Sequence, residues 1–160
     1  MPAAGDAAAL GVLFEGAPRF VARLTDAGPY ADDAALIAAA RAIAHEMPED
    51  EQVELIDAHP RLGAPPGTVS LLSFVEQGYD RDTGTPVDVA AELARLNGAY
   101  EARFGFRYCV FVAGRPREAL LPGMADALRA DRTAELHRAL DAVIDIAADR
   151  RAKLSAEAST

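Results

Sequence analysis

Prolines and glycines break this chain repeatedly, and the segments between the breaks carry the apolar spacing of α-helices. The breaks lie at Gly28-Pro29, Met47-Pro48, His59-Pro60, Thr85-Pro86 and residues 114–116. Proline ends or kinks a helix, and it disfavours helical geometry at the residue before it. Alanine and leucine dominate the composition, whereas clusters of strand-favouring residues are scarce. These features predict an all-α fold, a compact single-domain bundle of roughly eight helices.

Residues 86–104 show the clearest helical pattern. Their apolar stripe consists of Val89, Leu93, Leu96, Tyr100 and Phe104. Gly105 follows directly and suits the left-handed position at which many helices end. One short apolar stretch then lacks helical spacing, and it comprises Tyr108, Cys109, Val110, Phe111 and Val112. Periodicity leaves two possibilities open for it, a buried extended segment or a lone strand.

Several helix starts are marked by residues that suit a cap or a first position. These residues are Pro18, Asp32, Asp131 and either Thr68 or Ser70. A helix that begins near residue 116 is expected to be kinked or split at Pro122-Gly123. Residues 7–153 are expected to form the single domain, with frayed ends at residues 1–6 and 154–160.

The charge and cysteine content restrict the classes of partner. The net charge is −9 and there is no basic stripe, which argues against nucleic acid and anionic membranes as partners. No apolar run approaches the ~18 residues that span a bilayer, and the N-terminus lacks the basic region of a signal peptide. Cys109 is the single cysteine, so an intrachain disulfide is impossible. We expect a cytoplasmic protein.

The chemistry of the chain is concentrated in residues 57–80. His59 precedes a proline and is therefore expected at a helix end, with its ring able to face a cleft. Ser73, Glu76 and Gln77 are three and four positions apart, so they share one face of a short helix. An imidazole near a carboxylate, an amide and a hydroxyl suits proton transfer. On spacing alone, a structural role for His59 at the helix end, with its ring bound to a backbone group, is favoured over a catalytic one.

Other kinds of site find little support in the sequence. His45, His59 and His137 are scattered without metal-binding spacing, so no metal site is expected. His45 suits the last turn of its helix, where the helix dipole favours a cation. His137 lies among charged residues and is interpreted as surface. Cys109, inside an apolar run, is interpreted as packing rather than as a nucleophile.

Three motifs in order resemble a known family. AHPRLG occupies residues 58–63, S-x-x-E-Q residues 73–77, and LN-x-x-Y-x-x-x-FGF residues 96–106. Together they resemble the 2-oxo-4-hydroxy-4-carboxy-5-ureidoimidazoline (OHCU) decarboxylases, which form S-allantoin in urate degradation. The resemblance covers nearly the whole chain. It implies an all-helical single domain, commonly a homodimer, that binds a small-molecule substrate without a cofactor or metal.

The resemblance also implies roles for individual residues. His59 matches the catalytic acid/base, and Glu76 matches the carboxylate that pairs with the substrate. Ser73 and Gln77 match hydrogen-bonding residues for the ring. Pro60 would lie against the substrate, and Arg61 would contact either the substrate carboxylate or an acidic neighbour. The ureido end of the substrate would be contacted by backbone groups of Tyr108, Cys109, Val110, Phe111 and Val112.

Two departures from the family pattern leave two alternatives open. The loop from His59 to Glu76 is somewhat short for the family. Bulky residues stand around Glu76 where many members carry small or charged ones, namely Leu72, Phe74, Val75 and Tyr79. One alternative is a non-catalytic helical ligand-binding or scaffold protein that retains the fold. The other is a decarboxylase that acts on a related ureido-ring acid.

Overall fold

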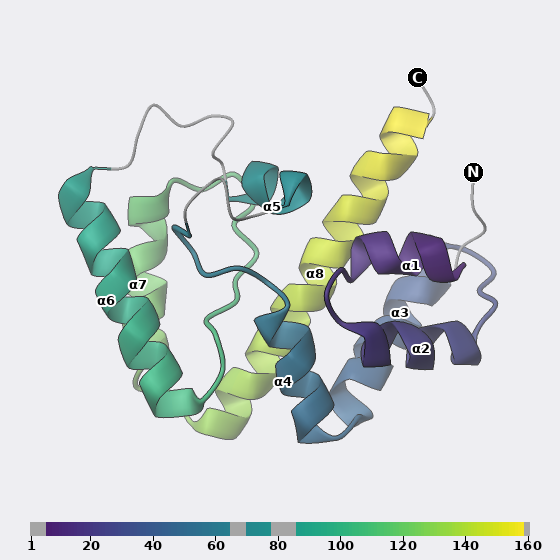
Figure 1. The fold of residues 1–160 in the computed structure, drawn as a ribbon, viewed down its shortest axis with the longest axis horizontal. Helices are drawn as coiled ribbons and strands as arrows, with labels where there is room; N and C mark the ends of the chain where they lie inside the picture. The colour runs from purple at the N-terminus through teal and green to yellow at the C-terminus, as the bar shows by residue number, and fades with distance from the viewer. Residues whose placement is uncertain (1–5, 65–69, 78–85, 159–160) are drawn as a thin grey trace. The chain divides into compact units, whose positions relative to one another are not determined.

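Helices account for all of the regular secondary structure in the described part of the chain. The computed structural model describes residues 6–64, 70–77 and 86–158, and it places eight helices within these ranges (Figure 1). The all-α prediction with about eight helices is therefore confirmed. None of these described helices is long and apolar enough to cross a membrane.

The backbone divides into two compact units. The first comprises residues 1–58 and 140–160, and the second comprises residues 59–139. The expected single domain over residues 7–153 stays a prediction. All the candidate site residues belong to the second unit.

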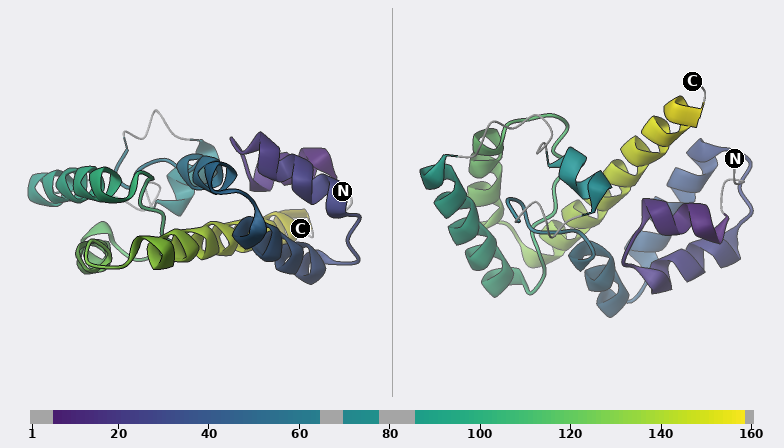
Figure 2. Two further views of the ribbon diagram at one scale, coloured as in Figure 1. Left: turned by 90° about the horizontal axis from the view of Figure 1, so that it is seen from below. Right: turned by 45° about the horizontal axis from the view of Figure 1, so that its top comes forward.

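The first unit is built from four helices and most of a fifth. They are α1 (Ala7–Leu13), α2 (Pro18–Ala27), α3 (Asp33–Glu46), α4 (Glu49–Asp57) and the later part of α8 (Arg132–Ala158). Helix α2 lies against both α1 and α3 (Figure 2). Pro18 opens α2, and Asp32 caps α3 by accepting a hydrogen bond from the backbone N–H of Ala35 at 2.8 Å, both as predicted.

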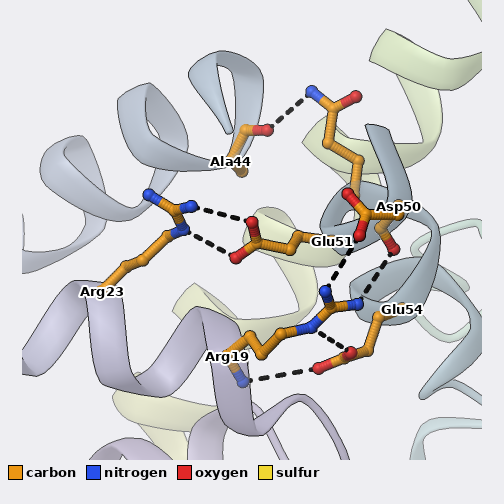
Figure 3. A network of polar contacts seen from close by, with 7 residues as sticks. Arg19, Arg23, Ala44, Asp50, Glu51 and Glu54 are labelled. Atoms are coloured by element: carbon orange, nitrogen blue, oxygen red, sulfur yellow. Dashed lines mark hydrogen bonds and ion pairs between the residues drawn. The ribbon is translucent and has the colours of Figure 1, made fainter. Parts of the chain in front are cut away.

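Two arginines of α2 bind the acidic start of α4 (Figure 3). Arg23 donates two hydrogen bonds to Glu51, at 2.7 and 2.8 Å. Arg19 reaches both Asp50, at 3.0 Å, and Glu54, at 2.7 Å. Asp50 and Glu51 lie in the first turn of α4, where carboxylates also suit the positive end of the helix dipole, so these two acids favour the start of α4 in two ways.

The second unit contains α5 (Leu71–Glu76), α6 (Val87–Phe104), α7 (Arg117–Ala127) and the first residues of α8. Helices α6 and α7 lie side by side (Figures 1 and 2). As predicted, α6 ends at Gly105, whose φ of 81° is left-handed and suits a residue without a Cβ. Asp131 caps α8 through Ala134, at 3.1 Å.

Three details differ from the expectations or resolve them. Helix α7 runs through Pro122 without a split, because Pro122 removes a single hydrogen bond, to the carbonyl of Glu118, in an exposed part of the helix. Residues 108–112 contain neither strand nor helix, which rules out the lone strand of the two alternatives, and they are called the extended segment below. Helix α8 continues to Ala158, so residues 154–158 are helical where a frayed end was expected. Residues 1–5, 159–160 and the alternative cap Thr68 lie outside the described residues.

Candidate functional site

The segment that carries His59 is an irregular loop held by side chains from other elements. It begins just after Ala58, the C-cap of α4, and ends at Gly63, whose φ is 79°. A Cβ on Gly63 would lie 3.3 Å from Cδ1 of Leu93, so this loop runs close against α6. Pro60 has no N–H, and no strand or helix includes residues 59–63, so their polar backbone groups need partners from elsewhere.

Gln77 supplies two of these partners. Its Nε2 donates to the carbonyl of Arg61 at 3.1 Å, and its Oε1 accepts from the N–H of Gly63 at 2.9 Å. The side chain is buried. Gln77, expected to bind the ring of a substrate, thus uses both ends of its amide to hold the loop.

Asn97 and Arg107 supply two more partners. Asn97 Nδ2 donates to the carbonyl of Leu62 at 2.9 Å, and Arg107 Nη1 donates to the carbonyl of His59 at 3.1 Å. Three carbonyls of the loop therefore accept hydrogen bonds from side chains of three separate segments. A loop held in this way keeps a defined path although it has no backbone ladder.

Arg61 pairs with an acidic neighbour. Its guanidinium makes two hydrogen bonds to Glu101 on α6, each at 2.8 Å. The Arg61 side chain is 51% exposed and that of Glu101 is 25% exposed. The structure thus contains the acidic-neighbour interaction that the sequence left open.

Helix α5 carries the other predicted site residues. Ser70 caps it by accepting from the backbone N–H of Ser73 at 3.1 Å. Ser73 is buried and Glu76 is partly buried. Arg117 of α7, itself buried, donates to the carbonyl of Gln77 at 3.2 Å. A cation at the C-terminal end of α5 suits the negative end of the helix dipole.

The extended segment at residues 108–112 is held by arginines. Arg138 donates to the carbonyl of Cys109 at 2.9 Å and lies over the ring of Tyr108, 4.9 Å from its centroid. Arg115 donates to the carbonyls of Phe111 at 2.6 Å and Val112 at 2.9 Å. Several of the backbone oxygens expected to meet a substrate are therefore already hydrogen-bonded within the chain.

A buried polar network lies behind this segment. The hydroxyl of Tyr100 donates to Glu135 Oε1 at 2.9 Å, and Arg138 Nε donates to the same oxygen at 2.6 Å. Tyr100 packs edge-on against Tyr108 with ring centroids 5.1 Å apart. Burial, and then the negative charge of Glu135, raise the pKa of Tyr100. The phenol therefore stays a neutral donor.

The structure therefore joins some predicted site residues by hydrogen bonds. The loop at residues 59–63 and Gln77 are linked directly, and Arg107 links the loop to the chain just before Tyr108. Sequence reasoning missed Asn97, Arg107 and Arg138. The sequence does hold one signal for Asn97. This polar amide stands four positions after Leu93, on the face of the helix that otherwise carries the apolar stripe.

The other histidines serve elsewhere. His45 Nε2 lies 2.9 Å from Asp141 Oδ1, on the last turn of α3 as predicted, and His137 is exposed on α8. Among the residues that the structure describes, no three His, Cys, Asp or Glu side chains are grouped so that they could hold a metal ion.

Comparison with known proteins decides the family. A family model described as OHCU decarboxylase matches residues 1–152. The chain belongs to the OHCU decarboxylase family. Members of this family are carboxy-lyases, and the predicted resemblance is confirmed.

Individual relatives agree with this assignment. The uric acid degradation bifunctional protein of Bacillus sp. (strain TB-90) is 26% identical over 140 residues, which cover 86% of this chain and 27% of the relative. The chain thus spans about a quarter of the length of that relative. A crystal structure of OHCU decarboxylase in the presence of (S)-allantoin matches with a TM-score of 0.71 and 25% identity, over 90% of this chain and 94% of that one. A crystal structure of (S)-allantoin synthase shares the fold, with a TM-score of 0.67 and 22% identity over 88% of this chain and 46% of that one.

Proposed function

We propose that this protein decarboxylates 2-oxo-4-hydroxy-4-carboxy-5-ureidoimidazoline to (S)-allantoin, within urate degradation. The family match over residues 1–152 supports the reaction class. The relative from Bacillus is named for uric acid degradation, and the solved OHCU decarboxylase was crystallised with (S)-allantoin. Both names agree with this substrate and this product.

The observation that carries the proposal is the loop that presents His59. Hydrogen bonds from Gln77, Asn97 and Arg107 fix its backbone. An acid/base group is effective only when it is held at hydrogen-bonding distance from the proton that it transfers. A histidine on a loop that is anchored on both sides of Pro60 can be held in this way, whereas a histidine on a freely moving surface segment cannot.

The chemistry needs a positioned proton more than it needs an electron sink. When the bond to the carboxylate breaks, CO2 leaves and its electron pair is accepted by the adjacent imine-like centre of the ring. The ring nitrogen then gains a proton, and the 4-hydroxyl group loses one as it becomes a carbonyl. Uptake of a proton at the ring carbon that bears the ureido group creates the stereocentre, so the net uptake is one proton. His59 would govern this proton, since an ordinary imidazole titrates near pH ~6.5.

The other roles follow the resemblance. Glu76 would hold the substrate and fix the protonation state of the imidazole, and Ser73 would hydrogen-bond the ring. Gln77 would do so only with the hydrogen-bonding capacity left over from the loop. Pro60 would pack on the ring, and the segment at residues 108–112 would meet the ureido end. Independence from cofactors, a homodimeric assembly and a cytoplasmic location remain part of this proposal.

The decisive test follows the optical activity of the product. The labile substrate is generated from urate with a urate oxidase and a hydroxyisourate hydrolase, and circular dichroism records the appearance of (S)-allantoin. The wild-type protein should give a fast dichroic signal. His59→Ala should lower the rate by about 10²–10⁴-fold, the usual contribution of a general acid or base, and Glu76→Gln should lower it strongly because a fixed charge is lost.

His137→Ala is the matched control, since it removes an exposed imidazole from α8. It should leave the rate unchanged. Full activity of His59→Ala, with helix content and melting temperature retained, would refute the assigned role of His59. Slow racemic product with the wild-type protein would refute the reaction itself.

A non-catalytic binding protein is the second candidate. The internal pairing of Arg61 with Glu101, and of Gln77 with the loop, favours it because these groups already have partners. Calorimetry with (S)-allantoin would show binding while the dichroic signal stays at the uncatalysed rate. A third possibility, turnover of a related ureido-ring acid, would appear as a product of different mass.

A further inference from the structure

We propose that Asn97 is a positioning residue, whose amide sets the place of the His59 loop without touching the substrate. This inference rests on the proposed function, because it concerns the loop that presents the acid/base. Asn97 lies in α6 and is 5% exposed. Its Nδ2 donates to the carbonyl of Leu62 at 2.9 Å.

The chemistry of the contact fixes its direction. A backbone carbonyl is only an acceptor, so the NH2 group of the amide must face Leu62. Leu62 is itself buried, so a carbonyl deprived of this donor would lose a hydrogen bond inside the protein. Such a loss costs about 1–3 kcal/mol, and a shift of the loop towards another donor would relieve it.

Asn97 is the most rigid of the three anchors. It reaches the loop from the interior of an 18-residue helix through a short side chain with few rotatable bonds. Gln77 reaches it from the end of a six-residue helix, and Arg107 does so through a long, partly exposed side chain. Arg61 also joins the loop to α6 through Glu101, but its side chain is long and 51% exposed. Asn97 is therefore the buried hydrogen bond that fixes the loop against α6.

The carbonyl that Asn97 binds is close in sequence to the imidazole of His59. Leu62 is three residues from His59, and Pro60 lies between them with φ restricted near −65°. A displacement at Leu62 is thus passed to His59 through a stiff backbone. Misplacement of a catalytic group by about 1 Å lowers turnover by as much as about 10²-fold.

The test uses Asn97→Asp, which keeps the shape of the side chain but replaces the donor by an oxygen. At neutral pH it should lower kcat by about 10–100-fold while KM changes by less than about twofold. When the pH is lowered from about 8 to about 5, the new buried carboxyl takes up a proton and regains a donor. The ratio of its kcat to that of the wild type should then rise. Asn97→Ala removes the donor without adding charge, and it should lose kcat at every pH.

Gln52→Glu is the matched control. Gln52 is also 5% exposed, and its amide donates to the carbonyl of Ala44 at 3.0 Å, in the first unit. The control should lose stability and keep its kcat. A positioning role is overturned if Asn97→Asp and Asn97→Ala lose no more kcat than Gln52→Glu, or if they raise KM and leave kcat unchanged.

A second readout separates this inference from the proposed function. The chain has three histidines, so the His59 imidazole is assigned in an NMR spectrum by its absence from His59→Ala. Both Asn97 variants should shift this signal, and Gln52→Glu should not. If the wild type proves inactive, the proposed reaction fails and this spectrum alone decides: an unshifted signal would overturn the role of Asn97, and a shifted one would support it.

Discussion

Removal of the Tyr100 hydroxyl tests the buried network behind the extended segment. Tyr100 is 1% exposed, and the Glu135 side chain that accepts its hydrogen bond is 5% exposed. A hydrogen bond to a charged group contributes about 1.5–3 kcal/mol. Glu135 keeps its second partner, Arg138, when Tyr100 is changed to phenylalanine. We therefore expect Tyr100→Phe to lower the free energy of unfolding by about 1.5–2 kcal/mol, near the lower end of this range.

The assay is urea unfolding followed by circular dichroism near neutral pH. For a chain of this size, the expected loss corresponds to a fall in melting temperature of about 3–8 °C. Tyr30→Phe is the matched control, because the hydroxyl of Tyr30 donates to a neutral acceptor, the carbonyl of Leu24, at 2.7 Å and is only partly buried. It should lose about 1 kcal/mol or less.

A double-mutant cycle sharpens this prediction. Glu135→Gln keeps the size of the side chain but removes its charge, so the hydroxyl of Tyr100 should contribute less in that background. A coupling energy above about 0.5 kcal/mol is expected for groups in direct contact. The reasoning fails if Tyr100→Phe is no more destabilising than Tyr30→Phe, or if the cycle shows no coupling.

Two further predictions concern glycines and an ion pair. Gly98→Ala should stabilise the protein by about 0.5–1 kcal/mol, because Gly98 lies inside α6 with open space at its Cβ position. Gly63→Ala should destabilise it by about 1–2 kcal/mol, because Gly63 has a left-handed φ and a Cβ there would contact Leu93. Thermal unfolding of both variants checks that the two changes in stability have opposite signs. Burial of Asp141 opposes its ionisation, but hydrogen bonds from His45 and Arg41 outweigh it and lower its pKa. A carboxyl whose folded pKa lies below its unfolded value adds stability that is present above the unfolded pKa, about 4, and is lost as the pH falls through the folded one. The free energy of unfolding of the wild type should thus exceed that of Asp141→Asn by at most about 1 kcal/mol at pH 7, since the Asp141 side chain is 46% exposed. Urea unfolding should show this difference closing below about pH 4. A difference that persists there would contradict this account.

The helices could be predicted from the sequence because their signals are local. Pro18, Asp32 and Asp131 act at the positions where they stand, and Gly105 ends α6 through its own φ. The split expected at Pro122 does not occur, since this exposed proline removes one hydrogen bond and need not divide the helix.

Partners of buried polar groups could not be predicted in the same way. Spacing correctly placed Ser73 and Glu76 on α5, with Gln77 at its C-cap, but it does not say what the Gln77 amide contacts. That amide bonds to residues 14 and 16 positions away, and Asn97 bonds to one 35 positions away. Such pairs depend on how separate helices pack, which no local pattern encodes.

These long-range bonds give a physical reason why the three motifs occur together. The first motif supplies an irregular loop whose carbonyls need donors, and the second and third supply amides, Gln77 and Asn97, that meet this need. The third motif also contains Tyr100, whose hydroxyl donates a hydrogen bond to Glu135. Glu135 also accepts one from Arg138, which in turn donates to the carbonyl of Cys109. Much of what resembles a substrate-binding signature is therefore the scaffold of the loop.

We expect substitutions at Gln77 to lower kcat through the loop as well as through any contact with substrate, so a loss of activity there does not by itself identify a ligand contact. Only a variant that raises KM and leaves the His59 imidazole signal unshifted would separate the two roles.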